Sequence, residues 1–285
     1  MTALSFLMWG LLTIYWKSVA HVSTYEVIAH RIVWTVAFLA VILTIQRRWG
    51  ELAAAARRPR DAARVAICGL CLGGNWYAFV WALANDRVLE ASLGYYINPL
   101  MSVLLGAVFL GERLRRLQLI ALVMTVIAVC NLLLAYGQVP WAGLALAFTF
   151  ALYGLLRKTS KLDSVPGVLA ETCAIAPPAL AFLVYLHRTD NLAFAGGGVG
   201  TTLLLLTAGL ATALPLLAFS FGARRIRLST VGFLQYLAPS CMFLLGVFAY
   251  GEPMELRKLA TFVTIWLALG IYSWDSVKAQ RRNAS

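Results

Sequence analysis

A segment that occurs twice constrains the fold of this chain more than any other feature. Residues 89–112 read LEASLGYYINPLMSVLLGAVFLGE, and residues 229–252, shifted by 140 positions without a gap, read STVGFLQYLAPSCMFLLGVFAYGE. Both copies carry a central proline, Pro99 or Pro239, and both end in Gly-Glu. Internal repetition defines the architecture of a chain and has to be recognised before single elements are assigned. We therefore expect two related halves.

The composition indicates that both halves lie in a membrane. The chain is 61% hydrophobic and 13% charged, whereas soluble domains are about 45–50% apolar and about 25% charged. A membrane-spanning helix needs roughly 20 apolar residues, and ten segments approach this length. Open backbone is not tolerated in lipid, and the alternating pattern of a membrane β-barrel is absent, so the segments should be helices. They cover, at about these positions, residues 3–19, 25–45, 64–84, 89–110, 117–135, 140–156, 166–186, 200–221, 229–250 and 258–275.

The positive charges define an orientation for these segments. Of the 24 Lys and Arg residues, 18 fall in one alternating set of gaps and five in the other, while Arg31 lies inside the second segment. Lysine and arginine concentrate on the cytoplasmic side of membranes, so both termini should be cytoplasmic in a multi-pass protein of the bacterial inner membrane. The first segment follows Met1 without a basic stretch, so we interpret it as a retained helix and not as a signal peptide.

An odd number of helices in each half inverts the second half relative to the first. We predict an all-α integral membrane fold of ten helices in two inverted five-helix repeats, residues 1–138 and 139–285, around a central cavity. Inverted repeats are typical of secondary transporters, which bind substrate near the midplane between the halves. The repeat is fainter elsewhere, for example between Trp9-Gly10-Leu11-Leu12 and Tyr153-Gly154-Leu155-Leu156.

Several motifs resemble those of the EamA-type transporters of the drug/metabolite transporter superfamily, most closely the RarD-like and YddG-like branches. The matching stretches are WGLLTIYWK at 9–17, AHRIVW at 29–34, NWYAFVWALAND at 75–86, LEASLGYYINPL at 89–100 and GERL at 111–114. The resemblance implies a cavity lined mainly by the first, third, fourth, sixth, eighth and ninth helices, with export as the activity. YddG-like members export aromatic and other amino acids, and RarD-like members are named for chloramphenicol sensitivity.

Prolines inside three of the segments are candidate hinges. Proline lacks an N–H and clashes with the carbonyl four residues back, so it bends a helix and releases that carbonyl. Pro99 and Pro239 would release the carbonyls of Tyr95 and Gln235, which occupy matching positions in the repeat. Pro215 is expected to bend the eighth segment in the same way. Either these bends shape and gate the cavity, or they are static packing kinks.

Aromatic and amide side chains near the centres of the segments are the candidate contacts for a substrate. Rings supply dispersion contacts and amides orient a polar group, which together suit an amphiphilic solute. Asn75 can alternatively tie its helix to a neighbour, because an amide facing lipid is costly. Some aromatics will face lipid, and Trp16 and Trp34 are better interpreted as interfacial. The candidate residues are Trp9, Asn75, Phe79, Tyr95, Asn98, Tyr153, Gln235 and Tyr236.

Charges inside the membrane are scarce, and each is a candidate for function. They are Glu26, His30, Arg31 and Glu171. Glu26 and His30 are four residues apart and share a helix face, and His30 could couple transport to protons. For all four residues the alternatives are a structural ion pair and a role in coupling or gating.

The repeat itself ends in a pair of carboxylates. Glu112 and its counterpart Glu252 should pair with neighbouring basic residues, Arg113 and Arg116 in the first copy and Arg257 and Lys258 in the second. Solvated helix ends are the alternative interpretation. Gly69 and Gly73 form a GxxxG motif, which favours close packing within the chain over dimerisation.

The favoured function is export of small amphiphilic metabolites, above all aromatic or neutral amino acids, by alternating access. A chloramphenicol-type permease is the alternative, and a membrane-embedded enzyme is a remote one because no catalytic cluster of His, Cys or carboxylates is visible. The expected partners are the substrate and the bilayer, with the protein a monomer or a weak homodimer. No cofactor, no metal site and no nucleic acid are expected, because the net charge of +12 lies in the gaps between apolar segments and the five cysteines lie within them.

Overall fold

The computed structural model of the chain describes residues 1–194, 196–251 and 256–284, and these residues are helical apart from short connections. Glu252, the expected partner of Arg257 and Lys258, lies outside the described residues, as do the side chains of those two basic residues. The helices are α1 (Thr2–Ser18), α2 (Thr24–Ile45), α3 (Trp49–Ala56), α4 (Pro59–Ala84), α5 (Val88–Leu110), α6 (Arg116–Tyr136), α7 (Trp141–Lys158), α8 (Ser164–Arg188), α9 (Gly198–Ala223), α10 (Leu228–Gln235), α11 (Leu237–Leu244), the π-helical turn η1 (Leu245–Ala249) and α12 (Leu256–Ala284).

Every segment expected to be helical is helical over most of its length, and α3 is an additional short helix that the sequence analysis did not predict. Seven helical stretches are long and apolar enough to cross a membrane: α2, α4, α5, α6, α8, α9 and the run from α10 to η1. The all-helical membrane fold is thereby confirmed. α1 has 17 residues and is shorter than a typical span, and neither α7 nor α12 is among the seven.

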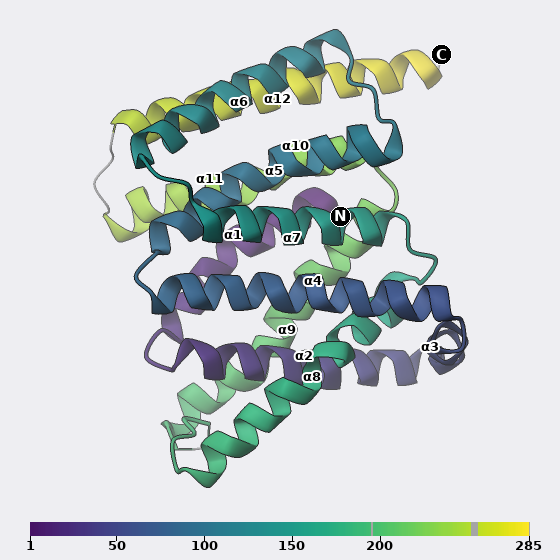
Figure 1. The fold of residues 1–285 in the computed structure, drawn as a ribbon, viewed down its shortest axis with the longest axis vertical. Helices are drawn as coiled ribbons and strands as arrows, with labels where there is room; N and C mark the ends of the chain where they lie inside the picture. Colours follow the sequence, from purple (N-terminus) through teal and green to yellow (C-terminus); the bar gives the residue numbers. More distant parts are fainter. Residues whose placement is uncertain (195, 252–255, 285) are drawn as a thin grey trace.

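The helices form a bundle whose packing scheme is unchanged when the two halves are exchanged. At one edge α6 packs on α12, and at the other edge α2 packs on α8 and α9 (Figure 1). Between these edges, the main contacts have counterparts in which the halves are exchanged. The contact of α5 with α7 corresponds to that of α11 with α1, and the contact of α4 with α7 to that of α9 with α1. The contact of α2 with α9 corresponds to that of α8 with α4, and α5 contacts its own counterpart α10. The long helices therefore pack chiefly against helices of the other half.

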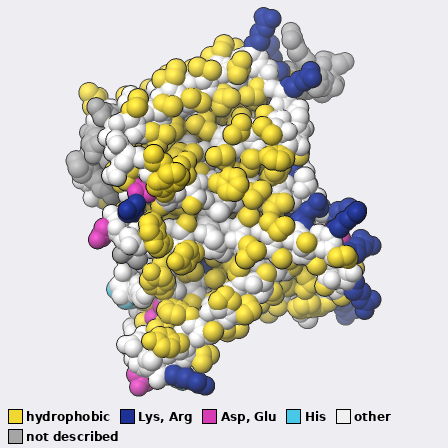
Figure 2. Space-filling view, viewed as in Figure 1, with side chains coloured by type: hydrophobic (Ala, Val, Ile, Leu, Met, Phe, Trp, Pro, Cys, Tyr) yellow, Lys and Arg dark blue, Asp and Glu magenta, His cyan; other side chains and the backbone are white. Residues whose placement is uncertain are grey.

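The surface of the bundle divides into apolar and charged zones. Figure 2 shows hydrophobic side chains over most of the visible face, with Lys and Arg gathered along the edge where α3 lies and near the C-terminal end of α12. Exposed apolar residues such as Leu134 (82%) and Val199 (78%) are typical of this surface. Large exposed apolar areas are unusual on soluble monomers, so this face is suited to contact lipid.

The prolines have different effects on their helices. Near Pro239 the helix is interrupted, because α10 ends at Gln235 and α11 begins at Leu237. Pro99 and Pro215 lie within the continuous helices α5 and α9. The hydroxyl of Tyr236, at the interruption, donates a 2.9 Å hydrogen bond to the carbonyl of Tyr96 in α5. The interruption of one repeated helix is therefore tied to the backbone of its counterpart, one residue from the carbonyl that Pro99 was expected to release.

Two glycines at matching positions of the repeat permit close helix crossings. A Cβ atom on Gly209 of α9 would lie 2.3 Å from the carbonyl carbon of Trp34 in α2, and one on Gly69 of α4 would lie 2.7 Å from the carbonyl oxygen of Glu171 in α8. Gly69 and Gly209 are 140 residues apart, so they are counterparts in the repeat. At the first crossing Thr35 donates a hydrogen bond to the carbonyl of Gly209. The GxxxG motif thus serves packing within the chain, as expected.

We predict that Gly209→Ala destabilises the protein by about 1–3 kcal/mol, because the added methyl group must displace the α2 backbone. The unfolding midpoint of purified protein in detergent measures the loss. Gly74→Ala is the matched control, since nothing lies within 4 Å of a Cβ atom at Gly74. Equal midpoints for the two variants would show that the α2–α9 crossing is looser than described.

Candidate functional site

A buried ion pair connects three helices at one end of the bundle. Arg157 of α7 donates a 2.9 Å hydrogen bond from Nη1 to Oε1 of Glu171 in α8, and both side chains are essentially inaccessible to solvent. Tyr153 donates to the other carboxylate oxygen at 3.1 Å. Nη2 of Arg157 donates to the hydroxyl of Ser220 in α9. A buried charge is costly unless it is paired and hydrogen-bonded, so this cluster holds α7, α8 and α9 in one arrangement.

The backbone around the ion pair leaves no room for other side chains. A Cβ atom on Gly167 would lie 2.1 Å from Nη1 of Arg157, so α8 presents a glycine where the guanidinium passes. Tyr153, expected to contact substrate, is fully buried against this pair. In this conformation its role is to support Glu171, because its hydroxyl is already engaged.

Five aromatic rings close the interior of the bundle beside the ion pair. The ring of Phe219 in α9 contacts four others, at centroid distances of 5.2 Å to Phe150, 5.8 Å to Trp9, and 5.9 Å to Phe6 and to Tyr153. These rings come from α1, α7 and α9, and apolar residues of α4, α5 and α10 pack in the same cluster. Trp9, a candidate contact for substrate, is therefore part of a packed layer that extends across the bundle.

Polar contacts join the two halves beyond this layer. The carboxylate of Glu112, after α5, accepts hydrogen bonds from the backbone N–H groups of Leu228 and Ser229 at 2.7 and 2.8 Å and from the Ser229 hydroxyl. These N–H groups begin α10, where a helix has unpaired donors and favours a negative charge. The ion-pair partner of Glu112 is Arg227, at 3.8 Å, and not Arg113 or Arg116 as the sequence analysis expected.

Asp163 forms a second connection at this end. Its carboxylate contacts Arg48, which follows α2, at 2.9 Å and Arg224, which follows α9, at 2.8 Å. Partial burial alone would raise the pKa of Asp163, but the hydrogen bonds from Arg48 and from the Ser164 backbone, together with the two positive charges, outweigh burial and lower it. Asp163 is therefore held in its charged form as the link between three connecting segments.

The opposite end of the bundle has its own carboxylate. Oε1 of Glu26 in α2 accepts hydrogen bonds from the backbone N–H groups of Ala193 and Phe194, at 2.9 and 3.1 Å, and lies 3.6 Å from Nε2 of His30. Nδ1 of His30 accepts from the indole N–H of Trp34. Trp34, interpreted from sequence as interfacial, thus contacts the interior. Since Nδ1 is an acceptor, a neutral His30 carries its proton on Nε2, facing Glu26.

Arg31, the next residue in α2, has a different environment. Its guanidinium carbon lies 4.3 Å from the ring centre of Trp16 in α1 and 5.1 Å from that of Trp76 in α4, and Nε donates a 3.0 Å hydrogen bond to Thr212 in α9. Trp16 is therefore not simply interfacial. No carboxylate pairs with Arg31 among the described residues, in contrast to the ion pair that was one expectation for it.

Two other candidates have polar atoms in reach of the interior. Tyr95 of α5 is 38% exposed although it lies mid-helix, and it is within electrostatic range of Arg31. The amide nitrogen of Asn75 donates to the carbonyl of Leu146 and to Thr149, so it ties α4 to α7. Its Oδ1 makes no hydrogen bond within the described chain and is not buried. Tyr95 and Oδ1 of Asn75 therefore stay available to a solute.

The remaining candidates lie where α5 meets α10 and α11, or beside them. Gln235 is buried and hydrogen-bonds Ser102, and Tyr236 is buried on α5 as described above. Oδ1 of Asn98 is buried without a partner in the described part of the chain. Phe79 packs with Ala82 and Ala91. Of the eight candidates, Tyr95 is the most exposed, while the binding role of all eight stays a prediction.

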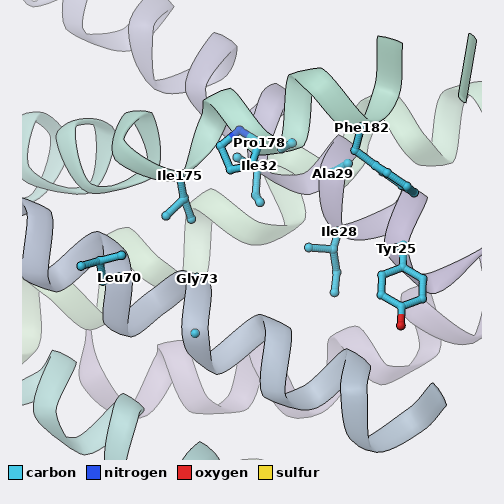
Figure 3. A pocket seen from close by; sticks show the side chains of 11 residues that line it. Tyr25, Ile28, Ala29, Ile32, Leu70, Gly73, Ile175, Pro178 and Phe182 are labelled. Carbon is cyan, nitrogen blue, oxygen red and sulfur yellow. The ribbon is translucent and has the colours of Figure 1, made fainter. Parts of the chain in front are cut away.

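A cavity of about 320 Å³ opens between α2, α4 and α8 (Figure 3). Ile28, Ile32, Leu70 and Ile175 point into it, with the ring of Tyr25 at one end. Its lining is almost entirely apolar. This cavity lacks groups that would orient a polar solute, so the better candidate site is the region of Arg31.

The sequence analysis missed several residues that the structure brings together. Arg157 was counted as a charge of a connecting loop because it directly follows the segment expected at residues 140–156. Trp76 and Thr212 carried no distinguishing pattern. A signal for Arg157 was available, since a lone intramembrane Glu171 needs a cation nearby. The inward placement of Trp16 depends on tertiary contacts and had no such signal.

Comparisons with known proteins agree with this architecture. The profile of the EamA-like transporter family matches residues 1–134. An uncharacterised transporter of Vibrio cholerae is 44% identical over 96% of this chain and 91% of its own length. Protein RarD of Escherichia coli is 39% identical over 98% of this chain and 95% of its own length. A solved crystal structure shares the fold with a TM-score of 0.69 over 96% of both chains, at 20% identity.

We predict that Glu171→Gln lowers the free energy of unfolding by about 3–5 kcal/mol, because it leaves the guanidinium of Arg157 buried without a counter-charge. Replacing both partners, as Arg157→Met with Glu171→Leu, should restore most of the loss. Unfolding midpoints of the purified variants measure both effects. If Glu171→Gln is as stable as the unmodified protein, the pair is not the constraint described.

Asp163 should make stability depend on acid. Its pKa is lowered in the folded state, so its contribution is complete above the pKa of the unfolded chain, about 3.9, and disappears as the pH falls through the folded value. Asp163→Asn is expected to lower the unfolding midpoint at pH 7 and to change it much less below pH 3. A difference between variant and unmodified protein that is independent of pH would contradict this linkage.

Proposed function

Because the chain belongs to the RarD-like EamA-type transporters, we propose that it exports small amphiphilic metabolites, above all amino acids, across the bacterial inner membrane by alternating access. The proposal rests on one observation. Arg31 and Tyr95 are partly exposed although they lie within helices that can span a membrane, and the rings around Phe219 pack with apolar residues of several helices. We infer that this region is reached from one side only, which is what alternating access requires in each of its two states.

We further propose that the bundle comprises ten membrane-spanning helices in two inverted halves, residues 1–138 and 139–285. The exchange of halves that leaves the packing scheme unchanged supports this division. The distribution of Lys and Arg supports cytoplasmic termini, because the basic side chains gather at the end that carries α3 (Figure 2). The closed end would then be cytoplasmic and the open site would face outward. Since Gly69 and Gly73 pack within the chain, a monomer is the simplest transporting unit.

Opening the cytoplasmic end requires α5 and α10 to separate. These helices meet where a Cβ atom on Gly106 would lie 3.3 Å from the Cβ atom of Leu228, next to the Glu112 contacts. Disulfides need Cβ atoms about 3.5–4.5 Å apart, so a small adjustment suffices for cysteines at the two positions. A cross-link there holds the closed end shut without touching Arg31 or Tyr95.

We predict that proteoliposomes containing a variant with cysteines at 106 and 228, and without the five native cysteines, transport labelled amino acids when reduced. Oxidation should reduce the transport rate by about 10-fold or more, because the cytoplasmic end can no longer open. Leu228→Cys alone, treated with the same oxidant, is the control. Transport that persists in the fully cross-linked protein would refute the proposed motion, and selective transport of chloramphenicol would assign the alternative substrate.

A further inference from the structure

Arg31 is an intramembrane cation without an anion. Arg157 of α7 is buried and is neutralised by Glu171, whereas the described residues supply no carboxylate to Arg31. The nearest carboxylate in α2, Glu26, accepts two backbone N–H groups and faces His30. Charged residues within membrane segments pair with a partner or serve a pathway, so the missing counter-charge requires an explanation.

The internal repeat identifies the position in the first half that corresponds to the charged partner in the second half. Arg31 of α2 and Glu171 of α8 are 140 residues apart and are therefore counterparts in the repeat. Their helices are counterparts as well, and they contact each other. In the second half, Arg157 of α7 neutralises Glu171. The counterpart of Arg157, aligned through Gly10 and Gly154, is Thr13 of α1, whose hydroxyl oxygen is buried without a partner in the described chain. At these matching positions the second half has the ion pair of Arg157 and Glu171, and the first half has Thr13 and Arg31.

The orientation of the guanidinium leaves its binding edge open. Nε is used by Thr212, and the two Nη groups make no hydrogen bond within the part of the chain that is described. Neither Nη atom is among the buried polar atoms, so both face accessible space. The rings of Trp16 and Trp76 hold the group through cation–π contacts. A guanidinium fixed in this way is suited to bind a carboxylate through two parallel hydrogen bonds.

We propose that Arg31 binds the carboxylate of a small organic solute carried by the protein, with the Tyr95 hydroxyl and Oδ1 of Asn75 in reach of the rest of the molecule. This inference deepens the proposed function, because it names the substrate class as amphiphilic organic acids, amino acids included. It also predicts discrimination, because chloramphenicol has no carboxylate and would leave the Arg31 guanidinium without a counter-charge. Arg31 is then the residue that selects the substrate.

The decisive measurement is binding to purified protein in nanodiscs made of zwitterionic lipid, which does not require transport. Two matched pairs of probes are used: phenylalanine with phenylalaninamide, and 3-phenylpropionate with 3-phenylpropionamide. Quenching of tryptophan fluorescence or displacement of a radiolabelled probe reports affinity. The unmodified protein should bind at least one acid about 10- to 100-fold more tightly than its amide, as a charge-assisted pair of hydrogen bonds predicts.

Variants of Arg31 test the assignment to this residue. Arg31→Gln should bring the acid-to-amide ratio close to one, and Arg31→Lys should retain an intermediate ratio because it keeps the charge without the two-pronged geometry. Arg225→Gln is the matched control, since Arg225 also lies over an aromatic ring, that of Phe221, but at the far end of α9. Its ratio should equal that of the unmodified protein.

The outcomes separate this inference from the proposed function. Equal affinity of the unmodified protein for acid and amide overturns the inference, and this result does not depend on whether any variant folds. An unchanged ratio in a folded Arg31→Gln variant also overturns it, even if amino acids are transported. A carboxylate preference that depends on Arg31 in a protein that transports nothing supports the site and refutes the exporter. Oleate tests the source: competition as strong as that of 3-phenylpropionate would assign the site to a membrane lipid and overturn a small-solute site.

Discussion

The structure depends on the neutralisation of charge inside an apolar bundle. Arg157 and Glu171 are buried together, and their contacts with Tyr153 and Ser220 hold α7, α8 and α9 in one arrangement. The aromatic layer around Phe219 packs directly against this cluster, and the contacts of Glu112 and Asp163 lie beyond it. Separation of the halves at this end must therefore break polar contacts of Glu112 and Asp163 but can leave the buried pair intact within the second half.

The two halves of the repeat share their helix packing but differ in their charged side chains. Gly69 and Gly209 allow matching helix crossings, so close packing is shared between the halves. Charge is not shared: the second half pairs Arg157 with Glu171, and the first half places Arg31 between Trp16 and Trp76 without a carboxylate. The complete ion pair of the second half supplies a stable frame, and under our proposal the unpaired cation of the first half binds a charged solute.

The helical segments were predictable from sequence because apolar length and proline placement act locally. Their ends were accurate to a few residues, with two exceptions. α4 begins at Pro59, with α3 before it, and α12 continues to Ala284, beyond the expected end near residue 275. The side-chain partners were much less predictable. Tyr153 and Gln235 looked like cavity residues because aromatic and amide groups near a midplane can face either a solute or a neighbouring helix. In the folded protein Tyr153 of α7 contacts Glu171 of α8, and Gln235 of α10 contacts Ser102 of α5, so both side chains are engaged with neighbouring helices. Arg31 was recognised as a candidate, but its lack of a counter-charge is a property of three dimensions.

The claim that the Arg31 region is open to one side is tested most directly by chemical accessibility. Tyr95→Cys in a background without the native cysteines places one thiol beside Arg31, and membrane-impermeant maleimide is applied to oriented vesicles from either face. The account predicts fast labelling from the outer face and at least about 10-fold slower labelling from the cytoplasmic face, because the layer around Phe219 lies between them. Labelling only from the cytoplasmic face, or equally from both faces, would contradict it.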